Sequence, residues 1–245
     1  MTGQSIEAFV AEQGKYAWRR RLIRGIIRQI GFRLLAKVEV TGSENIPDNG
    51  SCILMMNHIS ALDPVACVGA VTNRFVIPMT KIENLKVPVL GSLIRWWGAY
   101  SVDRDSVDRK ALLNSIELVK SGQMILIAPE GTRHPEGLSI PKDGMTYVAT
   151  KSNAVILPTT ISGKVDFLNR WKRLRRAQVR VNFGRPFRFL ADETVRIPRN
   201  VLAMMTQEAM YQLALAQPDP TLRGYYSDLS KATTKHIEFV NPAVL

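Results

Sequence analysis

The chain alternates between short, continuously apolar runs and longer amphipathic stretches. An apolar run of four to eight residues bounded by turn residues is typical of a buried strand, and an amphipathic stretch is typical of a helix that covers a sheet. This order predicts an α/β fold with a largely parallel central sheet flanked by helices. The predicted strands are 38–42, 51–56, 75–79, 99–102, 124–128, 154–161 and 178–184. The predicted helices are 16–37, 63–71, 87–98, 108–122 and 200–216.

The predicted N-terminal helix is basic as well as amphipathic. Its isoleucine and leucine residues recur with the helical period, and no acidic residue interrupts the arginines between them. Two interpretations stay open. The basic face is solvated while the helix packs on the body of the protein, or the helix lies on an anionic bilayer with Tyr16 and Trp18 near the interface. The positions concerned are Ile23, Ile27, Ile30 and Leu34, with Lys15, Arg19, Arg20, Arg21, Arg24, Arg28, Arg33 and Lys37.

Length, charge and composition narrow the possible functions. The 245 residues are enough for one large domain. Because no Pro/Gly/Ser linker divides the chain after residue 38, we expect 38–245 as one domain and 1–37 as a membrane-associating helical segment attached to it. The net charge of +12 favours an anionic partner. No run reaches the ~18 apolar residues of a spanning helix, and no secretory signal is evident. We therefore expect no fully membrane-embedded protein, and a surface-bound one stays open. Cys52 and Cys67 lie in apolar runs and predict neither a disulfide framework nor a nucleophile.

Candidate chemistry begins where the second predicted strand ends, in the sequence NHISALD. Sites in α/β folds gather at such strand ends. A neutral imidazole at His58 can take a proton from an alcohol, and a carboxylate on its other nitrogen fixes the tautomer. The two side chains can meet only if His58 lies in the turn and Asp63 at the start of the next helix. Asp63 before Pro64 is also well placed to cap that helix, and this alternative stays open.

A second candidate is the loop P-E-G-T-R, which follows the predicted strand 124–128. Gly131 permits a sharp turn, Arg133 offers a planar fork of donors to a phosphate, and Thr132 adds a hydroxyl. The alternative is a surface turn in which Glu130 and Arg133 pair with each other.

Other basic residues follow neighbouring predicted strands. Lys81 and Arg104 are candidate cations for the same edge of the sheet, although a solvated ion-pair network explains either one equally well. The segment 170–176, RWKRLRR, predicts a second anionic contact or a solvated basic loop. Three scattered histidines have no zinc-like spacing, so we expect no metal. The chain lacks interleaved aromatic residues for stacking bases, so we also expect no nucleic-acid partner.

The order of these motifs resembles the glycerolipid acyltransferase family, whose best-known members are the lysophosphatidic acid acyltransferases. The motifs are N-H-x-x-x-x-D from Asn57 to Asp63, G-x-x-x-x-D-R from Gly98 to Arg104, P-E-G-T-R from Pro129 to Arg133, and an apolar strand that contains Pro158. The resemblance runs from about residue 36 to 188. Two departures concern the acceptor: Ala128 stands where an aromatic residue is usual, and AYSV replaces a more aliphatic stretch.

The resemblance implies a role for each matching residue. His58 would be the general base, and Asp63 would orient it. Arg104 would bind the acceptor phosphate, and Pro158 would help to form the acyl site. The remaining implied substrate-binding residues are Asn57, Lys81, Glu130, Gly131, Thr132 and Arg133.

The implied reaction needs no cofactor or metal. A fatty acyl group would pass from acyl-CoA or acyl carrier protein to the free hydroxyl of 1-acyl-glycerol-3-phosphate (lysophosphatidate), giving phosphatidic acid. The resemblance thus implies a peripheral membrane protein that works at an anionic membrane surface, on the cytoplasmic face. The same chemistry on another lysophospholipid or on glycerol-3-phosphate is the first alternative. A non-catalytic basic module that binds anionic lipid or nucleic acid is the second.

Overall fold

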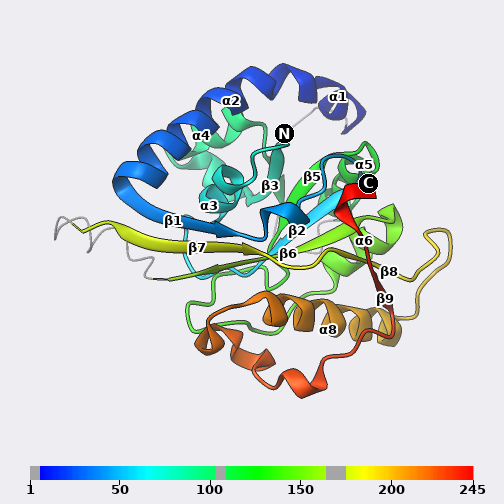
Figure 1. Ribbon diagram of the computed structural model, residues 1–245. Helices are drawn as coiled ribbons and strands as arrows, with labels where there is room; N and C mark the ends of the chain where they lie inside the picture. Colours follow the sequence, from blue (N-terminus) through cyan, green and yellow to red (C-terminus); the bar gives the residue numbers. More distant parts are fainter. Residues whose placement is uncertain (1–5, 103–108, 164–174, 245) are drawn as a thin grey trace.

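The computed structural model describes residues 6–102, 109–163 and 175–244 and is shown in Figure 1. Its centre is one sheet whose strands run in the order β1-β7-β6-β2-β5-β3-β4, with β8 paired to β6 and β9 paired to β8. The strands are β1 (Ala36–Thr41), β2 (Cys52–Met56), β3 (Val76–Lys81), β4 (Tyr100–Val102), β5 (Met124–Ile127), β6 (Val155–Ser162), β7 (Ala177–Phe183), β8 (Phe187–Phe189) and β9 (Ile237–Phe239).

Helices cover both faces of this sheet (Figure 1). The α-helices are α1 (Ile6–Ala11), α2 (Ala17–Ile26), α3 (Asp63–Ala70), α4 (Leu90–Trp97), α5 (Arg109–Lys120), α6 (Gly144–Ser152) and α8 (Arg199–Ala216). A π-helix, η2, extends α2 over Ile27–Leu35. The short 3-10 helices are η1 (Glu12–Tyr16), η3 (Ser43–Asn45), η4 (Ile82–Lys86), η5 (Pro220–Tyr226), η6 (Leu229–Lys231) and η7 (Pro242–Val244).

Parallel pairing dominates the sheet and fixes where its loops meet. Strand β2 pairs in parallel with β5 on one side and β6 on the other, and β3 pairs in parallel with β5 and β4. Strands β7, β8 and β9 add antiparallel pairs at β6 and beyond it. The carboxyl ends of β2, β3, β4, β5 and β6 therefore share one edge, and the predicted fold is confirmed.

Two apolar cores lie on opposite faces of the sheet, because successive side chains of a strand point to opposite sides. In β2, Ile53 and Met55 join the core beneath α1, α5, α6 and α8, whereas Cys52, Leu54 and Met56 join the core beneath η2 and α3. All five residues of β2 are buried, which explains why this strand is a continuous apolar run.

The N-terminal helices differ from the predicted single helix. The structure has helical turns from Ile6 onward, and the helix ends at Leu35, two residues before the predicted end, because β1 begins at Ala36. Three arginines spaced four apart bind this segment to the body. Arg20 Nε donates to Trp97 O at 2.8 Å, Arg24 Nη1 to Arg74 O at 3.0 Å, and Arg28 Nη1 to Gly69 O at 2.9 Å. Burial lowers the pKa of Arg20 to about 10.

Apolar side chains of the same helix face solvent. Positions two residues away from the binding arginines lie about 200° around the helix, on its far side. We call the exposed apolar set on this side the apolar ridge. It consists of Trp18, Leu22, Ile26 and Ile30, each two residues from a binding arginine, and of Leu34, four residues after Ile30; each is 47% to 66% exposed. The interpretation with a solvated basic face is thus only partly right, because three of the arginines reach inward. The apolar residues of the ridge point away from the sheet.

Candidate active site

The predicted site loops meet at the carboxyl-terminal edge of the parallel strands. The NHISALD segment follows β2, and the P-E-G-T-R turn follows β5, its immediate neighbour in the sheet. A backbone hydrogen bond joins the two loops, from His134 N to His58 O at 2.7 Å. The parallel sheet therefore brings together two motifs that are about seventy residues apart in sequence.

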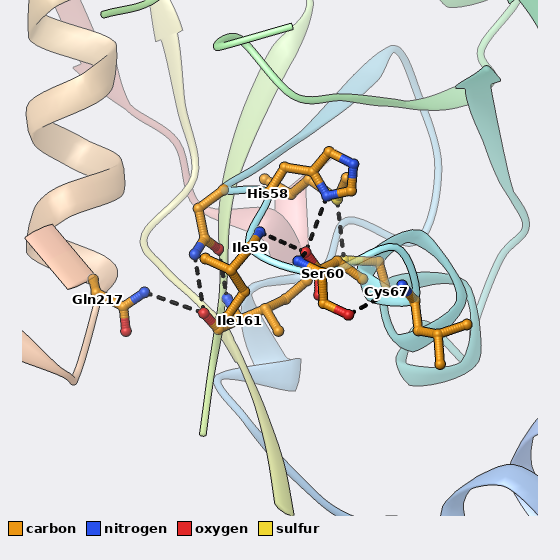
Figure 2. A network of polar contacts seen from close by, with 10 residues as sticks. His58, Ile59, Ser60, Cys67, Ile161 and Gln217 are labelled. Atoms are coloured by element: carbon orange, nitrogen blue, oxygen red, sulfur yellow. Dashed lines mark hydrogen bonds and ion pairs between the residues drawn. The ribbon is translucent and has the colours of Figure 1, made fainter. Parts of the chain in front are cut away.

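His58 and Asp63 form a hydrogen-bonded pair (Figure 2). The distance from His58 Nδ1 to Asp63 Oδ2 is 3.0 Å. The Asp63 side chain is 2% exposed and that of His58 is 14% exposed, so the carboxylate is shielded while the imidazole keeps access to solvent. This pairing leaves Nε2 of His58 as the nitrogen available to a ligand. This is the arrangement of imidazole and carboxylate that the sequence analysis expects if His58 is a general base.

Asp63 also shapes the loop that carries His58. Its Oδ2 accepts hydrogen bonds from Ile59 N at 2.7 Å and from Ser60 N at 2.6 Å (Figure 2). Helix α3 begins at Asp63 itself, its N-cap residue is Leu62, and no side chain caps it. The capping alternative is therefore wrong. Asp63 binds backbone groups on the loop side, and one carboxylate oxygen holds both the loop and the imidazole.

Asn57 fixes the other end of this loop to the sheet. Its Nδ2 donates to Ile161 O at 3.0 Å, and its Oδ1 accepts from Ile161 N at 2.7 Å. Gln217, which follows α8, donates to the same Ile161 O at 3.3 Å (Figure 2). This buried amide pairing positions His58 relative to β6, and contact of Asn57 with substrate stays a prediction.

The P-E-G-T-R turn is fixed by its backbone and by one buried carboxylate. Gly131 has a φ of 74°, a left-handed conformation that favours glycine. Glu130 is 4% exposed, and its Oε1 accepts from Ser139 N at 2.6 Å. Burial raises the pKa of Glu130 to about 7, against the opposing effect of backbone amides at Ser139 and His58. The Glu130–Arg133 surface pair considered above is not among the ion pairs of the described residues, and Glu130 points inward.

The other predicted residues have different surroundings. Thr132 and Arg133 are exposed on the turn. Lys81 ends β3 at the same edge and lies 3.6 Å from Glu83 Oε2. Pro158 is buried in β6 beside Met55 of β2. Arg104 lies outside the described residues, as does most of the basic segment 170–176.

The sequence analysis did not predict two features of the candidate site. One is the segment 138–143, whose amides bind the P-E-G-T-R turn, with Lys142 N donating to Pro129 O at 2.9 Å. The other is the pairing of Asn57 with Ile161. No periodicity marks either feature, because both depend on backbone groups that become neighbours only in the folded sheet.

Both cysteines are unsuited to nucleophilic chemistry. Burial raises the pKa of Cys52 to about 12 and raises that of Cys67 well above its ordinary value. Cys67 instead contacts Met56, with 3.9 Å between the two sulfur atoms. Among the described residues, no group of three His, Cys, Asp or Glu side chains is arranged to hold a metal ion. Within the same ranges, no helix has the length and hydrophobicity needed to cross a bilayer.

Comparison with known proteins agrees with this arrangement. The Acyltransferase family profile matches residues 37–162, a range that includes every residue of the predicted site. The chain belongs to the acyltransferase family. The family match spans the two loops that form the His58–Asp63 pair and the P-E-G-T-R turn.

Similar proteins have related names. A 1-acyl-sn-glycerol-3-phosphate acyltransferase from Borreliella burgdorferi is 35% identical over 54% of this chain and 53% of its own length. One from Streptococcus pneumoniae is 26% identical over 67% of this chain and 61% of its own length. The match thus spans between about half and three fifths of these relatives. The crystal structure of the 1-acyl-sn-glycerophosphate acyltransferase from Thermotoga maritima has a TM-score of 0.60 at 25% identity, covering 90% of this chain and 83% of that chain.

Proposed function

We propose that this protein is an enzyme that transfers a fatty acyl group from a thioester to the free hydroxyl of 1-acyl-glycerol-3-phosphate. The observation that carries the proposal is the 3.0 Å contact between His58 Nδ1 and the buried carboxylate of Asp63, at the sheet edge where the two motif loops are bonded to each other. The names of the relatives support the acceptor. They name 1-acyl-sn-glycerol-3-phosphate as the substrate of those proteins, and the similarity covers 54% and 67% of this chain.

The proposed step uses only side chains of this chain. Nε2 of His58 takes the hydroxyl proton while the acceptor oxygen attacks the thioester carbonyl. Asp63 stabilises the imidazolium that forms and keeps Nδ1 protonated. When the tetrahedral intermediate collapses, the carbon–sulfur bond breaks and the leaving thiolate takes the proton from His58 to become the free thiol. The balance closes with an ester and a free thiol, and no cofactor or metal takes part.

The exposed guanidinium of Arg133 supports a phosphate-bearing acceptor, because it lies on the turn beside the His58 loop. In this proposal Thr132 and Gly131 shape the acceptor site, Lys81 and Arg104 add charge at the same edge, and Pro158 borders the acyl chain. The donor is acyl-CoA or acyl carrier protein.

The test is acyl transfer by the purified full chain with labelled acyl-CoA and labelled acyl carrier protein. The acceptors are lysophosphatidate, glycerol-3-phosphate and lysophospholipids with larger head groups. We expect labelled phosphatidic acid as the main product, with one donor preferred. A product formed only from another acceptor would retain the chemistry and correct the substrate, whereas no ester product from any pair would reject the function.

We also propose that the protein binds the membrane surface through the apolar ridge on α2 and η2. Trp18 of the ridge contacts Trp96 of α4 edge to face, with 5.6 Å between ring centroids. Leu90 and Leu93 of α4 are 45% and 47% exposed, so they extend the apolar surface from one helix to the next. Exposed apolar side chains flanked by basic residues such as Arg21 suit the interface of an anionic bilayer. In this proposal the protein is peripheral and binds the cytoplasmic face of the membrane.

A matched pair of double variants tests the membrane face. Leu22→Ser with Ile26→Ser removes two ridge side chains, each 48% exposed, and Met204→Ser with Leu215→Ser removes two side chains of equal exposure from α8. In Figure 1, α8 covers the opposite face of the sheet. We expect the first pair to weaken sedimentation with phosphatidylglycerol vesicles at least tenfold and the second pair to have little effect. Equal effects of the two pairs would contradict this membrane face.

A further inference from the structure

A lysine that the sequence motifs do not include lies across the P-E-G-T-R turn. A Cβ built on Gly131 would be 3.5 Å from Lys142 Cε, 3.6 Å from Cδ and 3.8 Å from Nζ. The end of the Lys142 side chain therefore packs over the glycine, where any side chain at position 131 would stand. Because Gly131 has no side chain, it allows both the close approach of Lys142 and its own left-handed backbone conformation.

The backbone of Lys142 is held rigidly at this place. Its amide donates to Pro129 O at 2.9 Å, and three residues earlier the Ser139 amide donates to Glu130 Oε1 at 2.6 Å. Helix α6 begins two residues after Lys142. The lysine is thus fixed to the same turn that carries Arg133.

Among the residues that the structure describes, no carboxylate neutralises Lys142. Across residues 6–102, 109–163 and 175–244, Lys142 belongs to no ion pair and donates no side-chain hydrogen bond. The adjacent Asp143 accepts a hydrogen bond from Thr206 Oγ1 at 2.8 Å, and Glu130 is turned toward Ser139. Within the described ranges, Lys142 and Arg133 are therefore two exposed cations without an ion pair, Arg133 on the turn and Lys142 packed over it. The turn is bonded to the His58 loop through His134 N.

We infer that Lys142 contacts the phosphate of the acceptor and selects a phosphate monoester over a phosphodiester. This inference rests on the proposed function. Arg133 supplies a planar fork of donors, whereas the ammonium of Lys142 is a compact charge that adds most to a dianion. A monoester such as lysophosphatidate carries a charge of about −1.5 to −2 near pH 7, more than the single charge of a diester head group.

Steady-state kinetics of Lys142→Ala and Lys142→Gln test the inference, since the glutamine retains a long side chain over Gly131. The control is Lys120→Ala, which removes a positive charge at the C-terminal end of α5, close to the start of β5 at the opposite edge of the sheet. Lys120 pairs with Glu193 Oε2 at 3.0 Å, so this control tests the loss of a remote surface charge. For both position-142 variants we expect the KM for lysophosphatidate to rise about tenfold, the size of one charged hydrogen bond. We expect kcat and the donor KM to change less than twofold, and the KM for lysophosphatidylglycerol to rise about twofold.

The result that overturns the inference is a KM for lysophosphatidate in both variants within twofold of the wild-type value, or an equal rise for both acceptors. Calorimetric titration with glycerol-3-phosphate separates this failure from failure of the proposed function. If the wild type transfers acyl groups and the Lys142 variants have wild-type kinetics, the proposed function stands and the role of Lys142 is rejected. A wild-type protein without transfer activity would reject the function, and Lys142 would then stand only if the wild type binds glycerol-3-phosphate and both variants lose it.

Discussion

Replacing Asp63 by asparagine separates its role in catalysis from its role in the loop. Its Oδ2 accepts from Ile59 N, Ser60 N and His58 Nδ1 at 2.7, 2.6 and 3.0 Å. An asparagine can present a neutral oxygen at the same place and preserve both backbone bonds. An alanine removes every acceptor, so the two substitutions differ in stability but share the loss of charge.

The cost in stability follows from these bonds. A hydrogen bond to a charged group contributes about 1 kcal/mol more than a neutral one, so the loss of charge on two backbone bonds should cost about 2 kcal/mol in Asp63→Asn. In Asp63→Ala two donors, at Ile59 and Ser60, lose their partner at 1–3 kcal/mol each, for a total of about 4 kcal/mol. Urea unfolding of both variants measures the difference.

The cost in activity is larger than the cost in stability. Without the carboxylate, the imidazolium of His58 is no longer stabilised and its tautomer is no longer fixed, so kcat of Asp63→Asn should fall about a thousandfold with little change in KM. The control is Asp192→Asn, since the Asp192 side chain also accepts two hydrogen bonds, from Thr194 N at 2.8 Å and Thr194 Oγ1 at 2.7 Å. A folded Asp63→Asn protein that retains a third or more of the wild-type kcat would refute the reasoning and reduce Asp63 to a structural residue.

Three further predictions concern the loops around this pair. The pKa of Glu130 is raised from 4.5 to about 7, so its contribution to stability is fully present below pH 4.5 and is lost as the pH rises through 7. Glu130→Gln should therefore gain up to about 3 kcal/mol over the wild type at pH 8 but not at pH 4, as measured by chemical unfolding; equal differences at both pH values would exclude the buried charge as the cause. Asn57→Ala breaks both hydrogen bonds to Ile161, so it should lower the free energy of unfolding by about 3 kcal/mol. It should also reduce kcat with a smaller change in KM, whereas an unaltered melting temperature would contradict its positioning role. Gly131→Ala should cost about 1–2 kcal/mol because φ is positive there, and an unchanged free energy of unfolding would argue against that backbone conformation.

Most strands of the sheet could be predicted from the sequence, because parallel strands that are buried on both faces are continuous apolar runs. Strands β2 and β5 could be identified in this way. Strands β8 and β9 have three residues each, too few to show a period, and α6 has a weak apolar pattern with small and β-branched residues. These elements form because the surrounding sheet and α8 give them partners.

The parts of the site that depend on residue type and spacing could be predicted from the sequence. The parts that depend on contacts with backbone groups of distant segments could not. The approach of His58 to Asp63 needed only a turn followed by a helix start. The orientation of the N-terminal helix was different, because Arg24 and Arg28 bind carbonyl oxygens near the end of α3 that no sequence pattern reveals. Lys142 was missed for the same reason, since its relation to Gly131 exists only after the loop has folded.

The most direct test of the account is the rate of acyl transfer to lysophosphatidate by His58→Ala, compared with the wild type at saturating donor. Circular dichroism and thermal unfolding establish that the variant is folded. Because Nε2 of His58 is the proposed acceptor of the hydroxyl proton, we predict a loss of at least a thousandfold in kcat with vesicle binding unchanged. A folded variant with a kcat within tenfold of the wild type would contradict the central role of this histidine.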